Sequence, residues 1–419
     1  MELIATLGSN PLPVVVTALQ LRPLRLHLIC TTRVEPLAER VRSLVETKGI
    51  GRGEVLTLSE PAQLSSEQLE AELKRSTIPW EECDLDYTGG TKLIAAEVRA
   101  WWRQKNPTGT AIYLSEGGHL IFSPAQGGIG SLRVSVSLSF EELAGLHFEH
   151  GLACGDEHKE SPHREIAQRI LKFVCRDEPE GRDGFSEWMK LLPPVRLSSC
   201  EHNGVTYQNA DGMLAKNCGS GGPLVRHDLT AMFNTIGVAG TTLDEAVEKL
   251  SNGEREKSKR RLATLKWLEG EWLEVALAKR LVDTGLFDEV RQNVHRKDGS
   301  SQGDAFQADI VAVKGHRAYL FTCTTIDKAS QCKHKLFEAF QRVVRIGGEY
   351  SRVVLVSLME RPEDVLKAIR EDGWAGYDQA RSFGLPHLCG KSAASTLNPD
   401  GKPGPAQTLD DALRGWVNA

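Results

Sequence analysis

The chain has 419 residues, which is too long for one ordinary core and favours two or three domains. Hydrophobic residues at 40% and charged residues at 26% exclude disordered, collagenous and membrane-embedded classes, and a formal net charge of −5 excludes a uniformly basic nucleic-acid coat. The nine cysteines include no CxxC pair, and no apolar run approaches the roughly 20 residues of a spanning helix, so we expect a cytoplasmic protein with reduced thiols and no membrane partner.

The first 125 residues alternate short β-branched apolar runs with amphipathic stretches, which is typical of βαβ units. The predicted strands cover residues 3–7, 26–31, 54–58, 84–87 and 111–115. The predicted helices between them cover residues 11–21, 34–47, 66–76 and 91–105. Two further strands, at 119–123 and 132–138, follow without long crossovers. Residues 1–150 are therefore predicted to form an α/β domain, a doubly wound Rossmann-like sheet completed by an antiparallel hairpin.

Residues 151–255 are predicted to form a small helical or winged-helix connector. Helical segments at 164–175 and 184–192 precede a polar stretch at 198–222, which is rich in Gly and Asn and has room for two short strands. A charged stretch at 252–261 then leads into the next core.

Residues 256–375 follow a different order, which predicts a second α/β domain. A long helix at 262–281 is followed by strands at 289–294, 308–313 and 318–325, a helix at 329–345 and a strand at 352–357. The remaining residues, 376–419, are interrupted by Gly and Pro and are predicted to form a partly mobile tail with a last helix near 409–417.

Two turns of the first domain have the composition of a ligand site. In an open α/β sheet, ligands bind beyond the carboxyl ends of the strands, where neighbouring crossovers leave toward opposite faces. The first predicted strand ends in Gly8-Ser9-Asn10-Pro11, and the fourth ends in Thr88-Gly89-Gly90-Thr91-Lys92. Glycines permit close approach of the backbone, helix N-termini favour anions, and hydroxyl, amide and ammonium groups reach phosphates or bases. The turns after the second and fifth strands complete the predicted rim with Thr31, Thr32, Arg33, Ser115 and Glu116.

A structural explanation stands beside this one. A lone Gly-Gly turn is more often only a tight turn, and Lys92 is then a solvated residue of a first helical turn. Two such turns on neighbouring strands favour the ligand site. The chain contains neither GxGxxG nor GxxxxGK[ST], so dinucleotide binding and ATP hydrolysis have no motif support.

These two turns resemble those of the CRISPR-associated Rossmann-fold (CARF) domain, in its nuclease-fused branch. The residues that carry the resemblance are Leu7-Gly8-Ser9-Asn10-Pro11 and Tyr87-Thr88-Gly89-Gly90-Thr91-Lys92. The resemblance implies a homodimer that binds a cyclic oligoadenylate, usually cyclic tetra-adenylate, across its two-fold axis, with both turns gripping phosphates and adenosines. A two-fold ligand on a two-fold dimer lets each protomer present the same patch.

Two acidic residues of the second domain are candidate metal ligands. Glu274 shares a helical face with Trp267, Gly270, Leu277 and Leu281, and Asp309 lies in an apolar strand. Inward-facing acids need partners, and two carboxylates can hold Mg²⁺ or Mn²⁺, which favour oxygen ligands. The alternative is that each acid is a structural residue satisfied at the edge of its element.

The second domain also resembles the restriction-endonuclease-like domain, PD-(D/E)xK, of the same branch. The resemblance rests on the order of Gly270-Glu271-Trp272-Leu273-Glu274, Asp309, Lys335-Leu336 and Arg345-Ile346-Gly347-Gly348. In that family a helix Glu, a strand Asp and a Glu-x-Lys on the next strand bind metal and activate water. This sequence has Thr322 and Thr324 where that Glu and Lys are expected, and Gln307 at a position that is often acidic. Lys333 or Lys335, with Asp327 or Glu338, could compensate from the following helix, although the two lysines also suit a solvated helix face.

Three functions are therefore consistent with the sequence. The first is a metal-dependent nuclease, acting on DNA or RNA and activated by the ring nucleotide, with Glu274, Asp309 and Lys335 as catalytic residues. The second is a ligand-responsive binding protein whose nuclease domain has lost catalysis. The third is a sensor that cleaves its own ring through a ribose hydroxyl near Ser9 or Thr91.

Two other chemistries have little support in the sequence. Cys323 lacks an accompanying His and acid and suits a buried strand cysteine. His147, His150 and His158 around Cys154 match no common zinc spacing.

Overall fold

The structure is a computed structural model, and it describes residues 1–59, 66–124, 127–155, 162–175, 267–296, 306–374 and 378–418. The predicted helix at 184–192, the strand-bearing stretch at 198–222 and the charged stretch at 252–261 lie outside the described residues.

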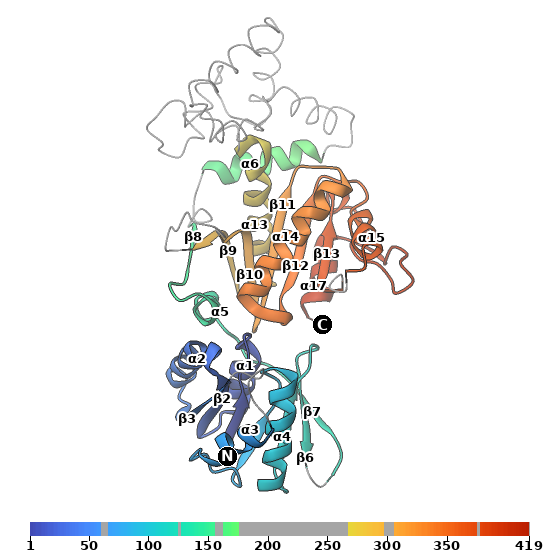
Figure 1. The fold of residues 1–419 in the computed structure, drawn as a ribbon. Helices are drawn as coiled ribbons and strands as arrows, with labels where there is room; N and C mark the ends of the chain where they lie inside the picture. Colours follow the sequence, from blue (N-terminus) through green and yellow to red (C-terminus); the bar gives the residue numbers. More distant parts are fainter. Residues whose placement is uncertain are drawn as a thin grey trace, which may run out of the picture.

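The N-terminal domain is built on a seven-stranded sheet in the order β3-β2-β1-β4-β5-β6-β7 (Figure 1). Strands β1 to β5 are parallel, and β6 and β7 add an antiparallel hairpin. The strands are β1 (Glu2–Thr6), β2 (Arg25–Thr31), β3 (Gly51–Leu58), β4 (Cys83–Asp86), β5 (Thr110–Leu114), β6 (His119–Pro124) and β7 (Gly130–Arg133). This confirms the doubly wound Rossmann-like sheet, because the order reverses between β1 and β4.

Strand β7 ends earlier than the sequence predicts, at Arg133. Beyond it the backbone leaves the sheet: the Ser135 N–H donates to Gln20 Oε1 at 2.8 Å, and the Leu138 N–H donates to the Gly315 carbonyl of the second domain at 2.9 Å. Between residues 134 and 138, hydrogen bonds to distant residues therefore take the place of strand pairing, although the apolar pattern predicted that the strand continues.

Helices cover both faces of the N-terminal sheet. One core cluster includes residues of α1 (Leu12–Leu21) and α2 (Glu35–Thr47), and a second includes residues of α3 (Ser66–Lys74) and α4 (Lys92–Lys105). Pro11 and Pro13 suit the start of α1, where the first N–H groups have no intrahelical partner. The two helix pairs therefore take opposite faces, as a doubly wound sheet requires.

The second domain contains a six-stranded mixed sheet in the order β13-β12-β11-β10-β9-β8. Strands β8 to β11 pair antiparallel, and β11, β12 and β13 pair parallel. The strands are β8 (Leu152–Gly155), β9 (Glu289–Arg296), β10 (Gln307–Lys314), β11 (Arg317–Thr324), β12 (Arg352–Ser357) and β13 (Ala380–Phe383). The predicted order of helix, three-stranded meander, helix and strand is present from residue 267 onward.

The sheet also recruits segments that the sequence places elsewhere. Strand β8 comes from the expected connector, and β13 comes from the expected tail. Helix α6 (Pro162–Val174) packs on α13 (Trp272–Thr284), where Gln168 Nε2 donates to the Ala276 carbonyl at 3.1 Å. Helix α17 (Leu409–Val417), predicted near 409–417, buries Leu409 and Leu413 in the same cluster. The tail segment therefore contributes to the core of the second domain.

Helices α13 and α14 (Ala329–Gly347) contribute to different core clusters. Leu273 and Leu277 of α13 belong to one, and Leu336 and Val343 of α14 belong to the other. A short π-helical turn, Trp267–Glu271, precedes α13. The remaining elements are α5 (Phe140–His147), α15 (Glu363–Glu371), α16 (Leu385–Leu388), the pair β14 (Ala393–Ala394) and β15 (Ala406–Gln407), and short 3₁₀ turns at Thr32–Val34 and Gly348–Tyr350.

The carboxyl edge of the N-terminal sheet faces the second domain, whereas the N-terminus lies at the far end (Figure 1). The cluster under α1 and α2 continues into the second domain through Phe148, whose ring packs edge-on against Phe306 with centroids 5.1 Å apart. No described helix is long and apolar enough to span a membrane.

Candidate functional site

The turns that follow β1 and β4 lie against each other at the carboxyl edge of the seven-stranded sheet. A Cβ atom on Gly8 would lie 2.7 Å from the Gly90 backbone nitrogen, and a Cβ atom on Gly89 would lie 2.2 Å from the Thr6 carbonyl oxygen. The Thr6 hydroxyl donates to the Gly89 carbonyl at 2.7 Å, and Gly90 has a φ of +84°. Only glycine permits this approach and this conformation. The structure therefore brings the two predicted turns together.

Asp86, the last residue of β4, fixes the second turn through hydrogen bonds to Thr88. Its Oδ1 accepts the Thr88 N–H at 2.9 Å and the Thr88 hydroxyl at 2.5 Å, and Thr88 Oγ1 accepts the Leu114 N–H at 2.8 Å. Burial raises the pKa of Asp86 to about 6, and the bonds from Thr88 oppose that rise. The nearby Thr17 hydroxyl also acts to lower the pKa of Asp86. Neither that hydroxyl nor Asp86 Oδ2 has a hydrogen-bond partner within normal distance and angle. The second turn is thus fixed by a buried carboxyl group that sequence reasoning did not single out.

The other predicted ligand residues surround these turns. Thr91 caps α4, where its hydroxyl oxygen accepts the Ile94 N–H at 3.3 Å, and the Lys92 side chain is exposed at the start of that helix. Ser115 closes the β5–β6 turn, because its hydroxyl exchanges hydrogen bonds with the backbone of His119. The remaining rim residues are a buried Thr31 at the end of β2 and exposed Thr32, Arg33 and Glu116.

A cavity of about 560 Å³ opens beside the first turn, between the two domains. Ser9 and Asn10 line it from the N-terminal domain, and the second domain contributes residues of β9, α14 and the turn after α14. The lining residues that sequence reasoning missed are Arg40, His147, Phe148, Glu149, Arg296, Val344 and Glu349. Arg345 and Gly348 also line it; the sequence marked them only through their order in the second domain.

The second domain touches the ligand edge directly. Tyr350 donates its hydroxyl to the Leu114 carbonyl at 3.1 Å, and its buried ring lies near the β4 and β5 turns. Burial raises the pKa of Tyr350 well above its usual value, and the charges of nearby Tyr113, Asp86 and Glu349 add to that rise. Gly348 packs on Asn10 so closely that a Cβ atom there would overlap the Asn10 amide group. The first turn is therefore in direct contact with the end of α14.

Asp309 is anchored in the sheet of the second domain. Its Oδ2 accepts the Cys323 N–H at 2.8 Å and the Thr322 hydroxyl at 3.1 Å. Thr322 thus lies beside Asp309 and is nearly fully buried. The Thr324 hydroxyl oxygen accepts the Ile326 N–H at 3.2 Å and closes the turn after β11. The hydroxyl groups of both threonines are hydrogen-bonded, and neither side chain is charged.

The charges of Glu274 and Lys335 act on Cys323, the strand residue whose N–H donates to Asp309. Burial raises the pKa of the Cys323 thiol well above its usual value, and the negative charges of Asp309 and Glu274 raise it further, whereas Lys335 lowers it. The charges of all three groups therefore act on the same strand residue, and Cys323 itself stays a protonated core thiol. Lys333 is directed elsewhere, since its Nζ binds Asp372 Oδ2 at 2.6 Å. Of the two candidate lysines, Lys335 is the one whose charge acts on Cys323, the residue that donates to Asp309.

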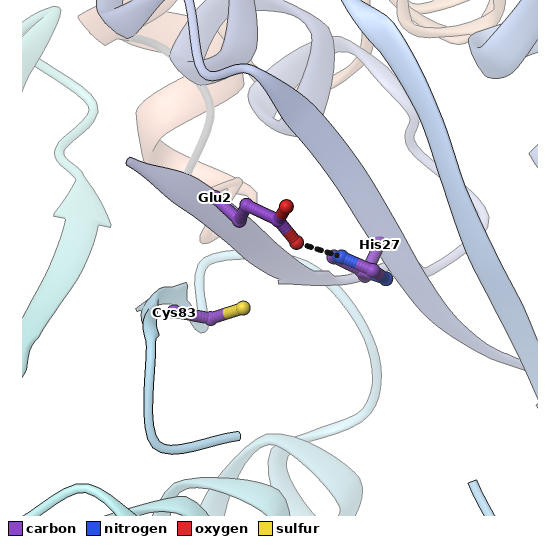
Figure 2. A group of neighbouring side chains, drawn as sticks. All are labelled: Glu2, His27 and Cys83. Atoms are coloured by element: carbon purple, nitrogen blue, oxygen red, sulfur yellow. Dashed lines mark hydrogen bonds and ion pairs between the residues drawn. The ribbon is translucent and has the colours of Figure 1, made fainter. Parts of the chain in front are cut away.

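One group of three potential metal ligands occurs among the described residues, and it lies away from both predicted sites. Glu2, His27 and Cys83 offer ligand atoms within 4.8 Å of one another in the N-terminal sheet (Figure 2). His27 Nδ1 accepts the Glu54 N–H at 3.0 Å, so the ring proton sits on Nε2, which donates to Glu2 Oε2 at 2.8 Å. Burial raises the pKa of Cys83 to about 12 and keeps its thiol protonated. With both ring nitrogens of His27 already committed, this group is a structural hydrogen-bonded cluster.

The histidines near Cys154 do not form a metal site in the described part of the chain. His147, His150 and Cys154 are not brought within ligand distance of one another, and His158 lies outside the described residues. Burial lowers the pKa of His147 to about 4, so it is neutral near pH 7.

The fold defines a two-domain α/β protein in which the carboxyl edge of a Rossmann-like sheet contacts a mixed-sheet domain. No protein-family model and no curated protein matches the sequence. Among solved structures, protein VC1899 from Vibrio cholerae is similar over 100% of this chain and 98% of its own, with a TM-score of 0.57 and 13% identity. Can2 from Sulfobacillus thermosulfidooxidans, in complex with cyclic tetra-adenylate, is similar over 100% of this chain and 99% of its own, with a TM-score of 0.57 and 13% identity. At this identity the similarity shows a shared fold.

Proposed function

We propose that this protein senses a cyclic oligoadenylate in type III CRISPR defence, with cyclic tetra-adenylate as the ring. The observation that carries the proposal is the packing of the Gly8 and Gly89–Gly90 turns at the strand-order reversal, which leaves hydroxyl, amide and ammonium groups at one edge. The shared fold with a protein that holds cyclic tetra-adenylate supports the same ligand class. The ring phosphates meet helix N-termini and Lys92, which favour negative charge.

The proposed receptor is a homodimer. A cyclic tetra-adenylate has two-fold symmetry, so two copies of the same edge can each hold half of it. The ligand residues on each copy are those of the four strand-end turns, including Ser9, Asn10, Thr91 and Lys92.

The second domain is the proposed effector, a nuclease acting on DNA or RNA. Glu274 and Asp309 would hold Mg²⁺ or Mn²⁺, because such ions are often bound by one or two carboxylates together with substrate phosphates. The bound ion would supply an activated water and neutralise developing charge. Thr322 and Cys323 orient the Asp309 carboxylate through their donated hydrogens, and Lys335 adds the positive charge that a phosphodiester needs nearby.

A second candidate function is supported by the same strand. The buried Thr322 and Thr324 provide no third charged ligand, and no third His, Cys, Asp or Glu ligand atom joins Glu274 and Asp309 among the described residues. The second domain would then bind nucleic acid or a partner protein under control of the ring without cutting. The third reading, ring cleavage by the sensor, keeps Thr91 as a candidate because its hydroxyl proton remains available while its oxygen caps α4.

Calorimetry with cyclic tetra-adenylate tests the sensor. The native chain should bind the ring, and Lys92→Ala should weaken binding at least about tenfold, because a charge-assisted phosphate contact is lost. Lys105→Ala is the matched control, since Lys105 lies at the other end of α4, over the Trp101 ring. Equal ring affinity in native and Lys92→Ala protein would remove Lys92 from the site.

Cleavage assays then separate the readings of the second domain. Supercoiled plasmid, single-stranded DNA and RNA are incubated with Mn²⁺, with and without the ring, using native, Glu274→Ala and Asp309→Ala proteins. Cutting that needs the ring and both acids establishes a nuclease. Ring binding without cutting establishes the binding protein, and shortened ring products, resolved by chromatography, establish self-cleavage.

A further inference from the structure

The cavity between the domains is lined by three arginines from three different elements. Arg40 comes from α2, Arg296 ends β9 and Arg345 lies in the last turn of α14. They share the cavity with Ser9 and Asn10 of the first ligand turn. Residues far apart in the sequence, from both domains, therefore place three arginines around one space of about 560 Å³.

The charge of this cavity favours an anion. Glu149 and Glu349 also line it, so the lining has three arginines against two glutamates, and Arg345, Glu149 and Glu349 are all exposed to solvent. His147 adds no charge near pH 7, since burial lowers its pKa to about 4, and its Nε2 atom is buried without a hydrogen-bond partner. In the tautomer that carries its proton on Nε2, His147 could donate to a phosphate oxygen.

Two of these arginines make contacts that restrict their side chains. Arg40 Nε donates to the Leu146 carbonyl at 3.2 Å, and the Arg345 guanidinium lies 5.9 Å from the centroid of the Phe148 ring. Such support lowers the entropy that a ligand contact must overcome, and guanidinium forks match phosphate geometry.

We infer that a phosphate group of the ring activator binds in this cavity, between Ser9–Asn10 and the guanidinium groups of Arg296 and Arg345. This inference rests on the proposed function and adds to it that the second domain supplies part of the ligand site. The activator then bridges the two domains. Phosphate held by Arg345 fixes the end of α14, and Lys335 lies ten residues earlier on that helix, roughly 15 Å along its axis.

Titration calorimetry with cyclic tetra-adenylate tests the inference on the full chain. Arg345→Ala and Arg296→Ala should each lower ring affinity at least about tenfold, and Arg345→Lys should lower it less because it keeps the charge. Arg342→Ala is the matched control: Arg342 lies one turn earlier on α14, outside the cavity, and pairs with Glu338. Thermal unfolding of each variant identifies those that fail to fold, and Arg345→Lys keeps the test valid if Arg345→Ala does so.

The outcomes separate this inference from the proposed function. Weakened binding in Arg345→Ala and Arg296→Ala, with Arg342→Ala unchanged, supports the bridging site. Native affinity in Arg345→Ala and Arg296→Ala, while Lys92→Ala loses affinity, overturns the bridging site and leaves the sensor intact. Absence of ring binding by the native chain overturns both.

Discussion

The buried carboxyl group of Asp86 makes the stability of the folded chain depend on pH. Its carboxyl group is fully buried, and burial raises its pKa to about 6 from an ordinary value near 3.8. Between these two values the folded chain holds a proton that the unfolded chain has released, so stability falls as pH rises through this window. Above pH 6 the folded state carries the full cost of a buried charge, which is about 2 to 3 kcal/mol.

Replacement of Asp86 by Asn should remove this cost. The amide oxygen can still accept both hydrogens from Thr88, and the amide nitrogen can donate toward Thr17. We expect Asp86→Asn to raise the free energy of unfolding at pH 7.5 and to flatten its decline between about pH 4 and pH 6. Urea unfolding across this pH range measures both, with Asp84→Asn as the control on the same strand. Lower stability of Asp86→Asn at pH 7.5 would contradict the assignment.

Single residues were predictable from sequence only where the local pattern forces them. The glycines of both turns and the candidate pair Glu274 and Asp309 stand out because type and spacing carry the signal. The arginines of the cavity and the role of Asp86 depend on tertiary contacts between segments up to about 300 residues apart, which periodicity does not encode. The choice between Lys333 and Lys335 likewise needed the position of Asp372.

At the scale of elements, α14 extends from the candidate catalytic residues of the second domain to the first predicted ligand turn. Its first half carries Lys335, whose charge acts on Cys323 of β11, and its end leads through Gly348 to the Asn10 side chain. Gly348 has a φ of +60°, which side chains rarely adopt. Asn10 Oδ1 in turn accepts the Leu12 N–H at the start of α1. The contact between Gly348 and Asn10 is therefore where the helix meets the ligand turn.

Substitution at Gly348 should disturb both stability and ligand binding. A Cβ atom there would overlap Asn10, in addition to straining the backbone, so Gly348→Ala should lower the free energy of unfolding by about 2 to 4 kcal/mol and weaken ring binding. Gly373→Ala is the control for a side chain added at a positive φ without a close contact, because Gly373 has a φ of +77° and an added Cβ would meet nothing within 4 Å. We expect about 1 kcal/mol and unchanged ring affinity there. Equal losses in the two variants, measured by urea unfolding and calorimetry, would show that the Asn10 contact is immaterial.

Most elements could be predicted, and the exceptions have physical causes. Apolar periodicity located the strands and long helices of both domains within a few residues. Strands β8 and β13 are short edge strands, whose pairing partners lie far away in sequence, so local pattern assigned them to a connector and a tail. The Gly and Pro residues that suggested a mobile tail instead lie in the turns between β13, α16 and α17. Phe383 of β13 and Leu413 of α17 are fully buried.

At the scale of the whole molecule, the ligand edge leaves apolar side chains exposed. Leu93, next to Lys92 in α4, is 53% exposed, and Tyr113 on β5 is 39% exposed while its ring packs against Tyr87. A two-fold ring placed at this edge would bring the same residues of a second copy opposite them. Burial of such side chains stabilises an interface by roughly 25 cal/mol per Å² before association costs.

The dimer should therefore depend on Leu93. Native protein should sediment at twice the mass of one chain, and Leu93→Glu should shift it toward the monomer and lower ring affinity in parallel, because a charge would be buried at the two-fold contact. Leu24→Glu is the matched control: Leu24 is 71% exposed but lies before β2, at the opposite end of the sheet, where its N–H donates to the Met1 carbonyl. Analytical ultracentrifugation at several protein concentrations, with and without the ring, reports both quantities. A native chain that stays monomeric while it binds one full ring would show that a single copy of this edge, together with the arginines of the second domain, is sufficient.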